Sequence, residues 1–302
     1  MNATQSAVIV RGGWDGHQPV ETTNEVIPFL QANGFEVAVH DGPGIYADAD
    51  VMTRTDLIVQ TMTMSTIGKD ELAGLIAAVR AGTGLAGWHG GIADSYRNEA
   101  DYLHLIGGQF AHHAQREEQL TGQQSDYFQR YTVHITDLGR RHPITRGIDD
   151  FHLETEQYWV LSDEYNDVLA TVTQEAREFD PWHRPVTSPA IWTRQWGAGR
   201  IFVCTPGHEL DVVRNPDVRV IIERGLLWAA RGQYAEDMSK QDSGRLHEPT
   251  GEWWYNNKTG EVEHGPQSLG VDRDGPFATR EEAERAPEIF AERSRQWAAD
   301  DD

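Results

Sequence analysis

Four side chains in this sequence have the types and settings for acid–base or metal chemistry. His89 stands at the end of a short apolar run and is followed directly by two glycines. His208 is in the same situation after an apolar run and a Pro-Gly turn. His113 follows two glycines and a phenylalanine, and Glu156 lies in an extended stretch beside aromatic residues. Because ligands bind at the carboxyl ends of strands in open α/β sheets, we expect these residues to face a cleft.

We predict that His89, Glu156 and His208 are the catalytic residues. Neutral imidazole is a ready general base. Burial of Glu156 next to Thr155 and Tyr158 would raise the pKa of its carboxyl group and make it a general base as well. The alternative is that each histidine only hydrogen-bonds its own loop, and that Glu156 is a charge at a strand edge in water.

The same histidines are candidate ligands for a divalent metal. His89, His113 and His208, with Glu156 nearby, supply three ligands and leave the open position that is typical of a catalytic zinc or manganese-like ion. The sequence contains no His-Glu-x-x-His or similarly spaced local motif. A divalent metal is therefore the one cofactor that the residues suggest.

Flat aromatic side chains beside polar loops indicate where a sugar ring could stack. We expect the substrate to contact Trp14, Trp88, Tyr158, Trp182 and His183. The last two belong to Asp-Pro-Trp-His, a loop that could cover a cleft. The same tryptophans also suit plain packing, so their number alone decides little.

Composition excludes several classes of partner. The 302 residues include 26 Lys and Arg against 48 Asp and Glu, a formal charge of −22. This charge argues against nucleic acid and against an anionic membrane surface, since binding phosphates needs clustered Lys and Arg. The single cysteine, Cys204, permits no intramolecular disulfide and no cysteine-rich zinc cage. With no signal peptide and no apolar run of about 20 residues, a cytoplasmic location is expected.

The elements that must position these residues follow from apolar periodicity and glycine stops. The first ninety residues predict strands and helices in the order β-α-β-β-α-β, at 6–13, 19–33, 35–40, 56–61, 69–81 and 85–88. This order favours a three-layer α/β/α fold with a mainly parallel sheet, of flavodoxin-like type.

The rest of the chain is expected to complete this domain and add a tail. Further extended stretches are predicted at 131–136, 151–160 and 168–172, a hairpin at 190–196 and 200–205, and a helix from Pro216. These elements close a first domain at 1–232, and a polar linker is expected at 233–249. A small β-hairpin plus helix at 250–302 would follow, its helix starting at the capping box of Thr279.

Several separated motifs resemble those of the ThuA-like (trehalose utilisation) family, whose fold is similar to the class I glutamine amidotransferase domain. They are Gly-Trp-His-Gly-Gly at 87–91, Gly-Gly-Gln-Phe-Ala-His-His at 107–113, His-Pro-Ile-Thr-Arg-Gly-Ile at 142–148, Glu-Thr-Glu-Gln-Tyr at 154–158, Pro-Ala-Ile-Trp at 189–192 and Gly-Arg-Ile-Phe-Val-Cys-Thr-Pro-Gly-His at 199–208. Ala114 stands where the family usually has proline, and Thr155 where it usually has aspartate. The tail from Glu252 resembles SPOR-like segments, and we expect it to be an accessory or oligomerisation element.

The resemblance implies a site without the amidotransferase nucleophile. That fold carries a cysteine at the turn after the strand ending near Trp88, where this sequence has His89. A histidine cannot replace the acyl-carrying thiolate, so a cysteine-dependent glutamine amidotransferase is excluded. Cys204 does not rescue the reaction, because Ile-Phe-Val-Cys is typical of a buried strand.

The family also implies catabolism of trehalose or a related glycoside oxidised to a 3-keto sugar. A base such as Glu156 or His89 could remove the proton at C2, and His208 or a metal could stabilise the resulting charge. Elimination followed by hydration would cleave the glycoside, and reprotonation elsewhere would isomerise it. The alternative is a non-catalytic sugar-binding or regulatory protein with the same cleft. The partners expected are the sugar and, through the tail, a second copy of the chain.

Overall fold

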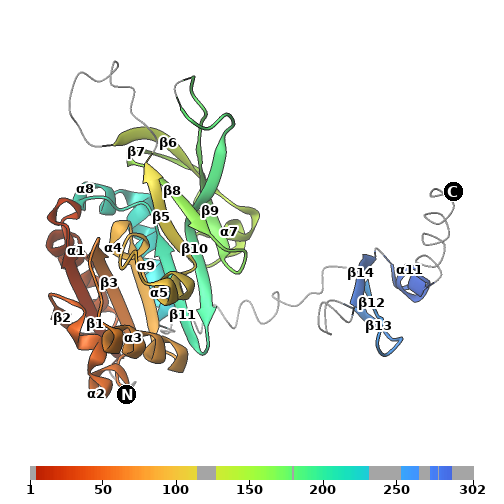
Figure 1. Ribbon diagram of the computed structural model, residues 1–302, viewed down its shortest axis with the longest axis horizontal. Coiled ribbons are helices and arrows are strands. Elements are labelled where there is room, and N and C mark those ends of the chain that lie inside the picture. Colours follow the sequence, from red (N-terminus) through yellow and green to blue (C-terminus); the bar gives the residue numbers. More distant parts are fainter. Residues whose placement is uncertain are drawn as a thin grey trace. The chain divides into compact units, whose positions relative to one another are not determined.

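The computed structural model of the chain describes residues 5–113, 127–178, 180–230, 253–264, 273–277 and 279–287 (Figure 1). The chain divides into two compact units, residues 1–236 and 237–302. The boundary falls inside the linker expected from the sequence, which itself lies outside the described residues. Within the described part, no helix is long and apolar enough to cross a membrane.

The first half of unit 1 confirms the predicted alternation of strands and helices. Its parallel strands lie in the order β2-β1-β3-β4. The elements are β1 (Gln5–Gly13), α1 (Pro19–Ala32), β2 (Phe35–His40), β3 (Leu57–Thr63), α3 (Lys69–Ala81) and β4 (Gly84–Trp88). All residues of β3 and β4 are buried, which is typical of parallel strands covered on both faces. Three short helices here were not expected from the sequence, namely η1 (Asp15–His17), η2 (Pro43–Ala47) and α2 (Ala49–Met52).

The second half adds an antiparallel part to the same sheet. β11 (Gly199–Cys204) pairs with β4 in parallel, and four antiparallel strands continue the sheet beyond it. They are β10 (Val186–Trp196), β9 (Asp167–Gln174), β6 (Phe128–Ile135) and β7 (Phe151–Glu156). The sheet is thus parallel on one side and antiparallel on the other, and the predicted hairpin at 190–205 is confirmed as β10 and β11.

The stretch predicted as one extended segment at 151–160 is in fact two strands. β7 ends at Glu156, and β8 (Tyr158–Ser162) leaves the large sheet to pair with β5 (Gly108–His113). Only Gln157 separates them. Glu156 is the last residue of β7 and pairs with Phe128 of β6, and His113 is the last residue of β5 and pairs with Tyr158 of β8.

The core has two halves, one on each face of the sheet. Alternate residues of β1 belong to different clusters: Ala7 and Ile9 pack with Leu30 of α1, whereas Val8 and Val10 pack with Leu75 of α3. α9 (Pro216–Ala229) adds to the first cluster, and its amino end is capped by the Asn215 side chain. The predicted three-layer α/β/α fold is confirmed. The remaining helices are short: α4 (Gly90–Ala93), α5 (Ala100–Ile106), α7 (Asp137–Arg141) and α8 (Leu210–Val213).

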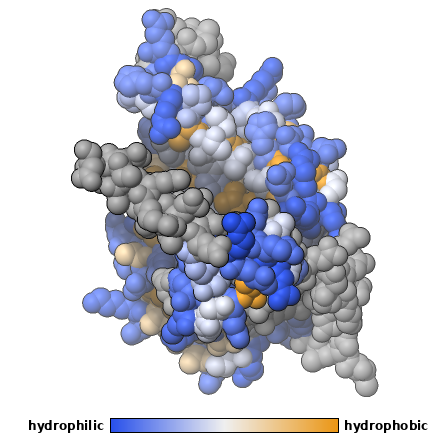
Figure 2. All heavy atoms as spheres, turned by 90° about the vertical axis from the view of Figure 1, so that its right-hand side faces the viewer, coloured by the Kyte–Doolittle hydropathy of each residue, from blue (hydrophilic) through white to orange (hydrophobic). Residues whose placement is uncertain are grey.

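Unit 2 forms a small antiparallel sheet with one helix. β12 (Trp253–Asn256) pairs with β13 (Val262–His264), as predicted, and on its other edge with β14 (Arg273–Phe277), which was not predicted. The Thr279 hydroxyl accepts a hydrogen bond from the Glu282 N–H at 3.1 Å, so Thr279 caps the amino end of α11 (Arg280–Glu284), where the sequence predicts the helix to start. Figure 2 shows one face of the protein covered mainly by hydrophilic side chains, as the excess of acidic residues leads one to expect.

Candidate functional site

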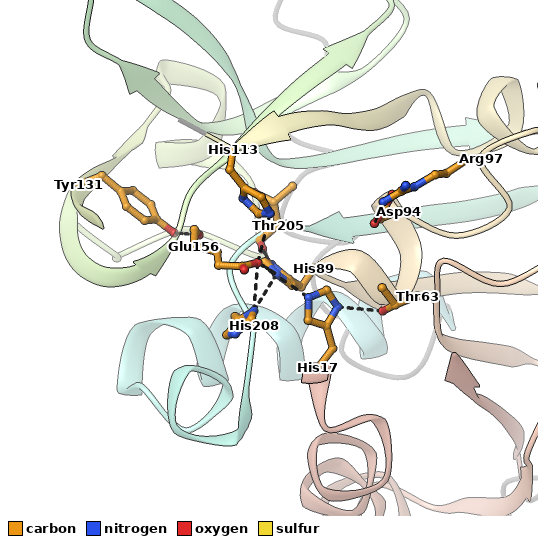
Figure 3. A network of polar contacts seen from close by, with 10 residues as sticks. All are labelled: His17, Thr63, His89, Asp94, Arg97, His113, Tyr131, Glu156, Thr205 and His208. Atoms are coloured by element: carbon orange, nitrogen blue, oxygen red, sulfur yellow. Dashed lines mark hydrogen bonds and ion pairs between the residues drawn. The ribbon is translucent and has the colours of Figure 1, made fainter. Parts of the chain in front are cut away.

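Four polar side chains meet beyond the carboxyl ends of the parallel strands (Figure 3). His17 follows β1, His89 follows β4 and His208 follows β11, and Glu156 arrives from the end of β7. One ligand-type atom from each lies within 4.8 Å of the corresponding atom of every other. We call these residues the His17/His89/Glu156/His208 cluster. All four are buried, with between 1% and 8% of their surface exposed.

His89 occupies a sharp turn between β4 and α4. Its backbone angles, φ 48° and ψ −141°, are unfavourable for a residue with a side chain and cost on the order of 1–3 kcal/mol. Its N–H donates to the Cys204 carbonyl at 2.7 Å, which holds the turn against β11. A Cβ at Gly91 would lie 2.6 Å from the Thr61 Cα, so this close packing requires glycine. The turn thus has the strand-to-helix form that presents one side chain to a cleft.

The imidazole ring of His89 has a fixed orientation. Its Nδ1 lies 2.7 Å from the Thr205 carbonyl oxygen, which can only accept, so Nδ1 carries the proton and donates it. Nε2 then faces the Glu156 Oε2 at 3.0 Å and the His208 Nδ1 at 3.3 Å. Burial, together with the nearby His17, lowers the pKa of His89 to about 3. At neutral pH the ring is therefore uncharged, and Nε2 presents a lone pair to the cluster.

Glu156 is the centre of the cluster. Its Oε2 lies 3.1 Å from the His208 Nδ1, 3.8 Å from the His17 Nε2 and 3.6 Å from the His113 Nε2. Burial acts to raise the pKa of this carboxyl group, but the imidazoles of His17, His208 and His89 around its Oε2 outweigh burial and hold the pKa well below its usual range. The expectation that burial raises the pKa of Glu156 is therefore wrong in direction, because the sequence could not show three imidazoles around one oxygen.

His17 is the cluster member that the sequence analysis missed. Its Nδ1 lies 2.9 Å from the Thr63 hydroxyl, and Nε2 points toward Glu156. The ring packs so closely on Gly90 that a Cβ there would lie 2.5 Å from the His17 Cε1. A signal was present in the sequence, because His17 comes shortly after β1, which ends in two glycines. His89 likewise comes directly after β4.

His113 lies beside the cluster rather than in it. Its side chain is 15% exposed, and its ring stacks on Tyr127 with centroids 4.6 Å apart. Burial lowers its pKa, with Glu156 acting in the opposite direction. The predicted metal-binding trio of His89, His113 and His208 is thus brought together around Glu156, but His17 replaces His113 in the four-residue cluster.

Exposed aromatic rings surround the buried cluster. Trp14 is 47% exposed and lies 4.8 Å from the His17 ring. Phe128 is 37% exposed and lies 5.3 Å from the His208 ring, and the exposed Tyr127 covers His113. We call Trp14, Tyr127 and Phe128 the aromatic rim. Sequence reasoning named only Trp14 of these three.

The other four residues predicted to contact the substrate, which are Tyr158, Trp88, Trp182 and His183, do not belong to the aromatic rim. Tyr158 is buried with its ring 4.1 Å from His89, where it forms a wall of the cluster. Trp88 is 2% exposed and packs in the core, with Gly207 against its ring. Trp182 packs edge-on against Trp159 and donates from Nε1 to the Glu175 carbonyl. Its neighbour His183 is exposed, and within the described residues neither contacts the cluster.

An ion pair and the single cysteine complete the surroundings. Arg97 donates from Nη2 to the Asp94 carboxylate at 2.6 Å, and Figure 3 shows this pair on the Thr63 side of the cluster. Burial raises the pKa of Asp94, opposed by Arg97. Cys204 is fully buried in β11, and burial raises the pKa of its thiol, so it is a packing residue and no nucleophile.

Comparison with known proteins supports the fold. A family model described as trehalose utilisation matches residues 6–229. A ThuA-like protein from Parabacteroides merdae is similar in structure at 15% identity and a TM-score of 0.57, over 76% of this chain and 90% of its own. A ThuA-like protein from Bacteroides uniformis shares 14% identity at a TM-score of 0.55, over 76% and 93%. No curated protein matches the chain. Such identities show the fold alone, and the family model ends before the tail.

Proposed function

Since the chain belongs to the trehalose utilisation (ThuA) family and so has a role in carbohydrate catabolism, we propose that it acts on a 3-keto-glycoside by removing the C2 proton. The single observation that carries this proposal is the buried carboxylate of Glu156 among three imidazoles, surrounded by the aromatic rim. A sugar ring can stack on an exposed aromatic face while its polar edge meets the cluster.

The proposed reaction begins with proton transfer. The 3-keto group acidifies the C2–H bond, and its proton passes to the Glu156 carboxylate or to His89. The pKa of each group lies below its usual range, so the transfer depends on stabilisation of the charge that forms on the substrate. The bonding electrons move onto the carbonyl oxygen and form an enediolate. Stabilisation of that charge by a cation or a hydrogen-bond donor such as His208 supplies the largest share of the rate.

The enediolate has two outcomes. In the first, the electrons of the enediolate re-form the C3 carbonyl and the C1 substituent is expelled, which leaves a double bond between C1 and C2. The leaving oxygen takes a proton. Water then adds to the double bond, so the glycoside is cleaved. If the proton returns at the other carbon, the sugar is isomerised. Both need the same first step, and the protein must hold the C2–H bond against Glu156 and His89.

The test is turnover of a keto-sugar. We expect the purified protein to change the product profile of 3-keto-trehalose, measured by NMR, and to leave trehalose itself intact. Glu156→Gln keeps the size of the side chain but removes its charge, and should slow turnover by about 10²–10⁴-fold. The matched control is His104→Gln, which changes an exposed histidine of α5 that packs on Trp196 and should keep the wild-type rate.

A sugar-binding function without catalysis is the second candidate, and the exposed aromatic rim favours it. It predicts that wild-type protein binds a disaccharide in calorimetry but leaves 3-keto-trehalose unchanged. Trp14→Ala would then weaken binding, whereas Glu156→Gln would have no rate to lower. Absence of turnover by the wild-type protein, with or without added divalent metal, would contradict the keto-glycoside reaction.

A further inference from the structure

We propose that the His17/His89/Glu156/His208 cluster is a divalent metal site with three imidazole nitrogens and one carboxylate oxygen as ligands. The proposal stands on the geometry of these four side chains and does not depend on which sugar the protein uses. It also corrects the ligand set expected from the sequence, because His17 replaces His113 as the third histidine.

The spacing of the ligand atoms fits one ion. Nitrogen or oxygen atoms at about 2.1 Å from a tetrahedral zinc ion lie about 3.4 Å from one another. The separations here are 3.0 Å for His89 and Glu156, 3.1 Å for His208 and Glu156, and 3.3 Å for His208 and His89. The His17 nitrogen lies 3.8 Å from the same carboxylate oxygen. These are four of the six separations in the cluster, and all six lie within 4.8 Å. His89, Glu156 and His208 thus have the spacing of ligands around one ion, and His17 is the more distant fourth ligand.

The hydrogen bonds behind the ligands support this arrangement. Metal-binding histidines almost always have the second ring nitrogen hydrogen-bonded, which fixes the tautomer and aims the other nitrogen at the ion. The His89 Nδ1–H donates to the Thr205 carbonyl, so Nε2 faces inward with its lone pair. The His17 Nδ1 contacts the Thr63 hydroxyl at 2.9 Å, which leaves the His17 Nε2 aimed at the cluster.

A cation also resolves an electrostatic conflict within the cluster. The His89 Nε2 and the Glu156 Oε2 are 3.0 Å apart, and in the tautomer fixed by Thr205 both present lone pairs. Two buried acceptors in contact are unfavourable unless positive charge lies between them. A metal ion among the four atoms satisfies all of them at once. A proton shared between His89 and Glu156 is the competing explanation, and the test below separates the two.

The chemistry of the ligands selects the kind of ion. Imidazole nitrogens suit zinc, copper, iron and nickel, whereas magnesium, calcium and manganese prefer oxygen ligands, so three imidazoles with one carboxylate favour zinc or iron. The cluster is buried, but His113 lies 3.6 Å from Glu156 on the side of Tyr127. A substrate oxygen could bind the ion only as a fifth ligand, and the ion would then supply the positive charge that an enediolate requires. With Glu156 Oε2 and His89 Nε2 bound to the ion, the free Glu156 Oε1 would be the proton acceptor.

The experiment measures metal binding without substrate. Untagged protein is dialysed against chelator and then titrated with Zn²⁺ and with Mn²⁺ in a calorimeter, and metal content is measured by mass spectrometry. We expect one equivalent per chain for at least one of the two ions. His17→Gln and Glu156→Gln should each weaken binding by at least about 100-fold, and Thr63→Val by about 10–100-fold through the loss of the hydrogen bond to His17.

Matched controls keep the result unambiguous. His183→Gln removes an exposed histidine and should bind metal like the wild type. Circular dichroism and gel filtration identify any variant that fails to fold, and Thr63→Val serves where a cluster variant does so. If the folded wild-type protein takes up neither ion at micromolar concentration, or if His17→Gln binds as tightly as the wild type, the metal site is refuted. Metal binding without turnover of 3-keto-trehalose leaves the metal site standing and overturns only the proposed reaction.

Discussion

At the scale of single residues, burial rather than sequence neighbours sets the protonation of the histidines. The pKa of His89 falls to about 3 because its ring is buried beside two further histidines. His142, far along the chain in the His-Pro turn, shows the same effect without the cluster: burial, followed by the positive charge of Arg200, lowers its pKa to about 4. Its Nδ1 accepts a hydrogen bond from the Ile144 N–H at 3.3 Å, which only the neutral ring can do.

His142 therefore makes the stability of the protein dependent on pH. Its pKa is about 4 in the folded state and 6.5 in the unfolded state, so only the unfolded chain takes up this proton between those values. The contribution is present above pH 6.5 and is lost as the pH falls toward 4. At pH 5 the loss is about 2 kcal/mol. Urea unfolding at pH 7.5 and at pH 5 measures it.

The control for this prediction is His142→Asn, which retains an acceptor for the Ile144 N–H but does not titrate. The wild-type protein should lose about 2 kcal/mol more than the variant between the two pH values. Both proteins contain the same His17/His89/Glu156/His208 cluster, so its titration cancels in the comparison. Equal losses in the two proteins would show that His142 is not the group responsible.

At the scale of elements, close backbone contacts hold the helices and strands that carry the site. Gly74 in α3 packs directly on η2, and a Cβ there would overlap the Tyr46 carbonyl oxygen. Tyr46 in turn donates to the Gln60 side chain of β3 at 3.0 Å. The contact between α3 and η2 is thus coupled to the strand that ends in Thr63, behind His17.

Gly74→Ala should destabilise the protein, although alanine is the better helix former. Helix propensity alone favours alanine by about 1 kcal/mol. The added methyl group meets backbone that cannot move without shifting η2, so we expect a net loss of about 2 kcal/mol or more in the free energy of unfolding. The matched control is Gly44→Ala in η2, whose Cβ would meet nothing closer than 3.9 Å. Thermal unfolding of both variants tests the prediction, which fails if Gly74→Ala is as stable as Gly44→Ala.

At the scale of the whole molecule, the site belongs to unit 1 alone. Every residue of the cluster and of the aromatic rim lies within residues 1–236, and the family model matches residues 6–229. Unit 2 has its own small sheet and its own capped helix. The role of this tail as an oligomerisation element remains a prediction from the sequence.

Removal of residues 237–302 should leave the site intact. We expect the chain 1–236 to retain metal binding, turnover and thermal unfolding within about 0.5 kcal/mol of the full chain, because surface changes away from the core have small effects. Light scattering of both chains tests the tail, which should be needed for any dimer. A truncated protein that loses metal affinity would contradict the assignment of the site to unit 1.

Local sequence patterns were enough to predict the parallel half of the fold and the placement of two site histidines. Buried parallel strands are continuous apolar runs and helices have a 3.6-residue period, so β1, α1, β3, α3 and β4 could be predicted from local pattern. Because glycine-containing turns follow β4 and β11, His89 and His208 could be placed at the carboxyl ends of these two strands. The absence of the cysteine nucleophile could also be predicted, since the turn contains no cysteine.

Which of these residues come into contact depends on long-range folding of the chain. His89 and Glu156 are 67 positions apart, and His208 and His89 are 119 apart, so no local spacing encodes their contact. The break between β7 and β8 brings Glu156 to the strand ends, and a short helix brings in His17, neither of which has a periodic signal. The low pKa of Glu156 follows from that convergence, because long-range pairing of strands sets the charges around a buried group, and local sequence does not.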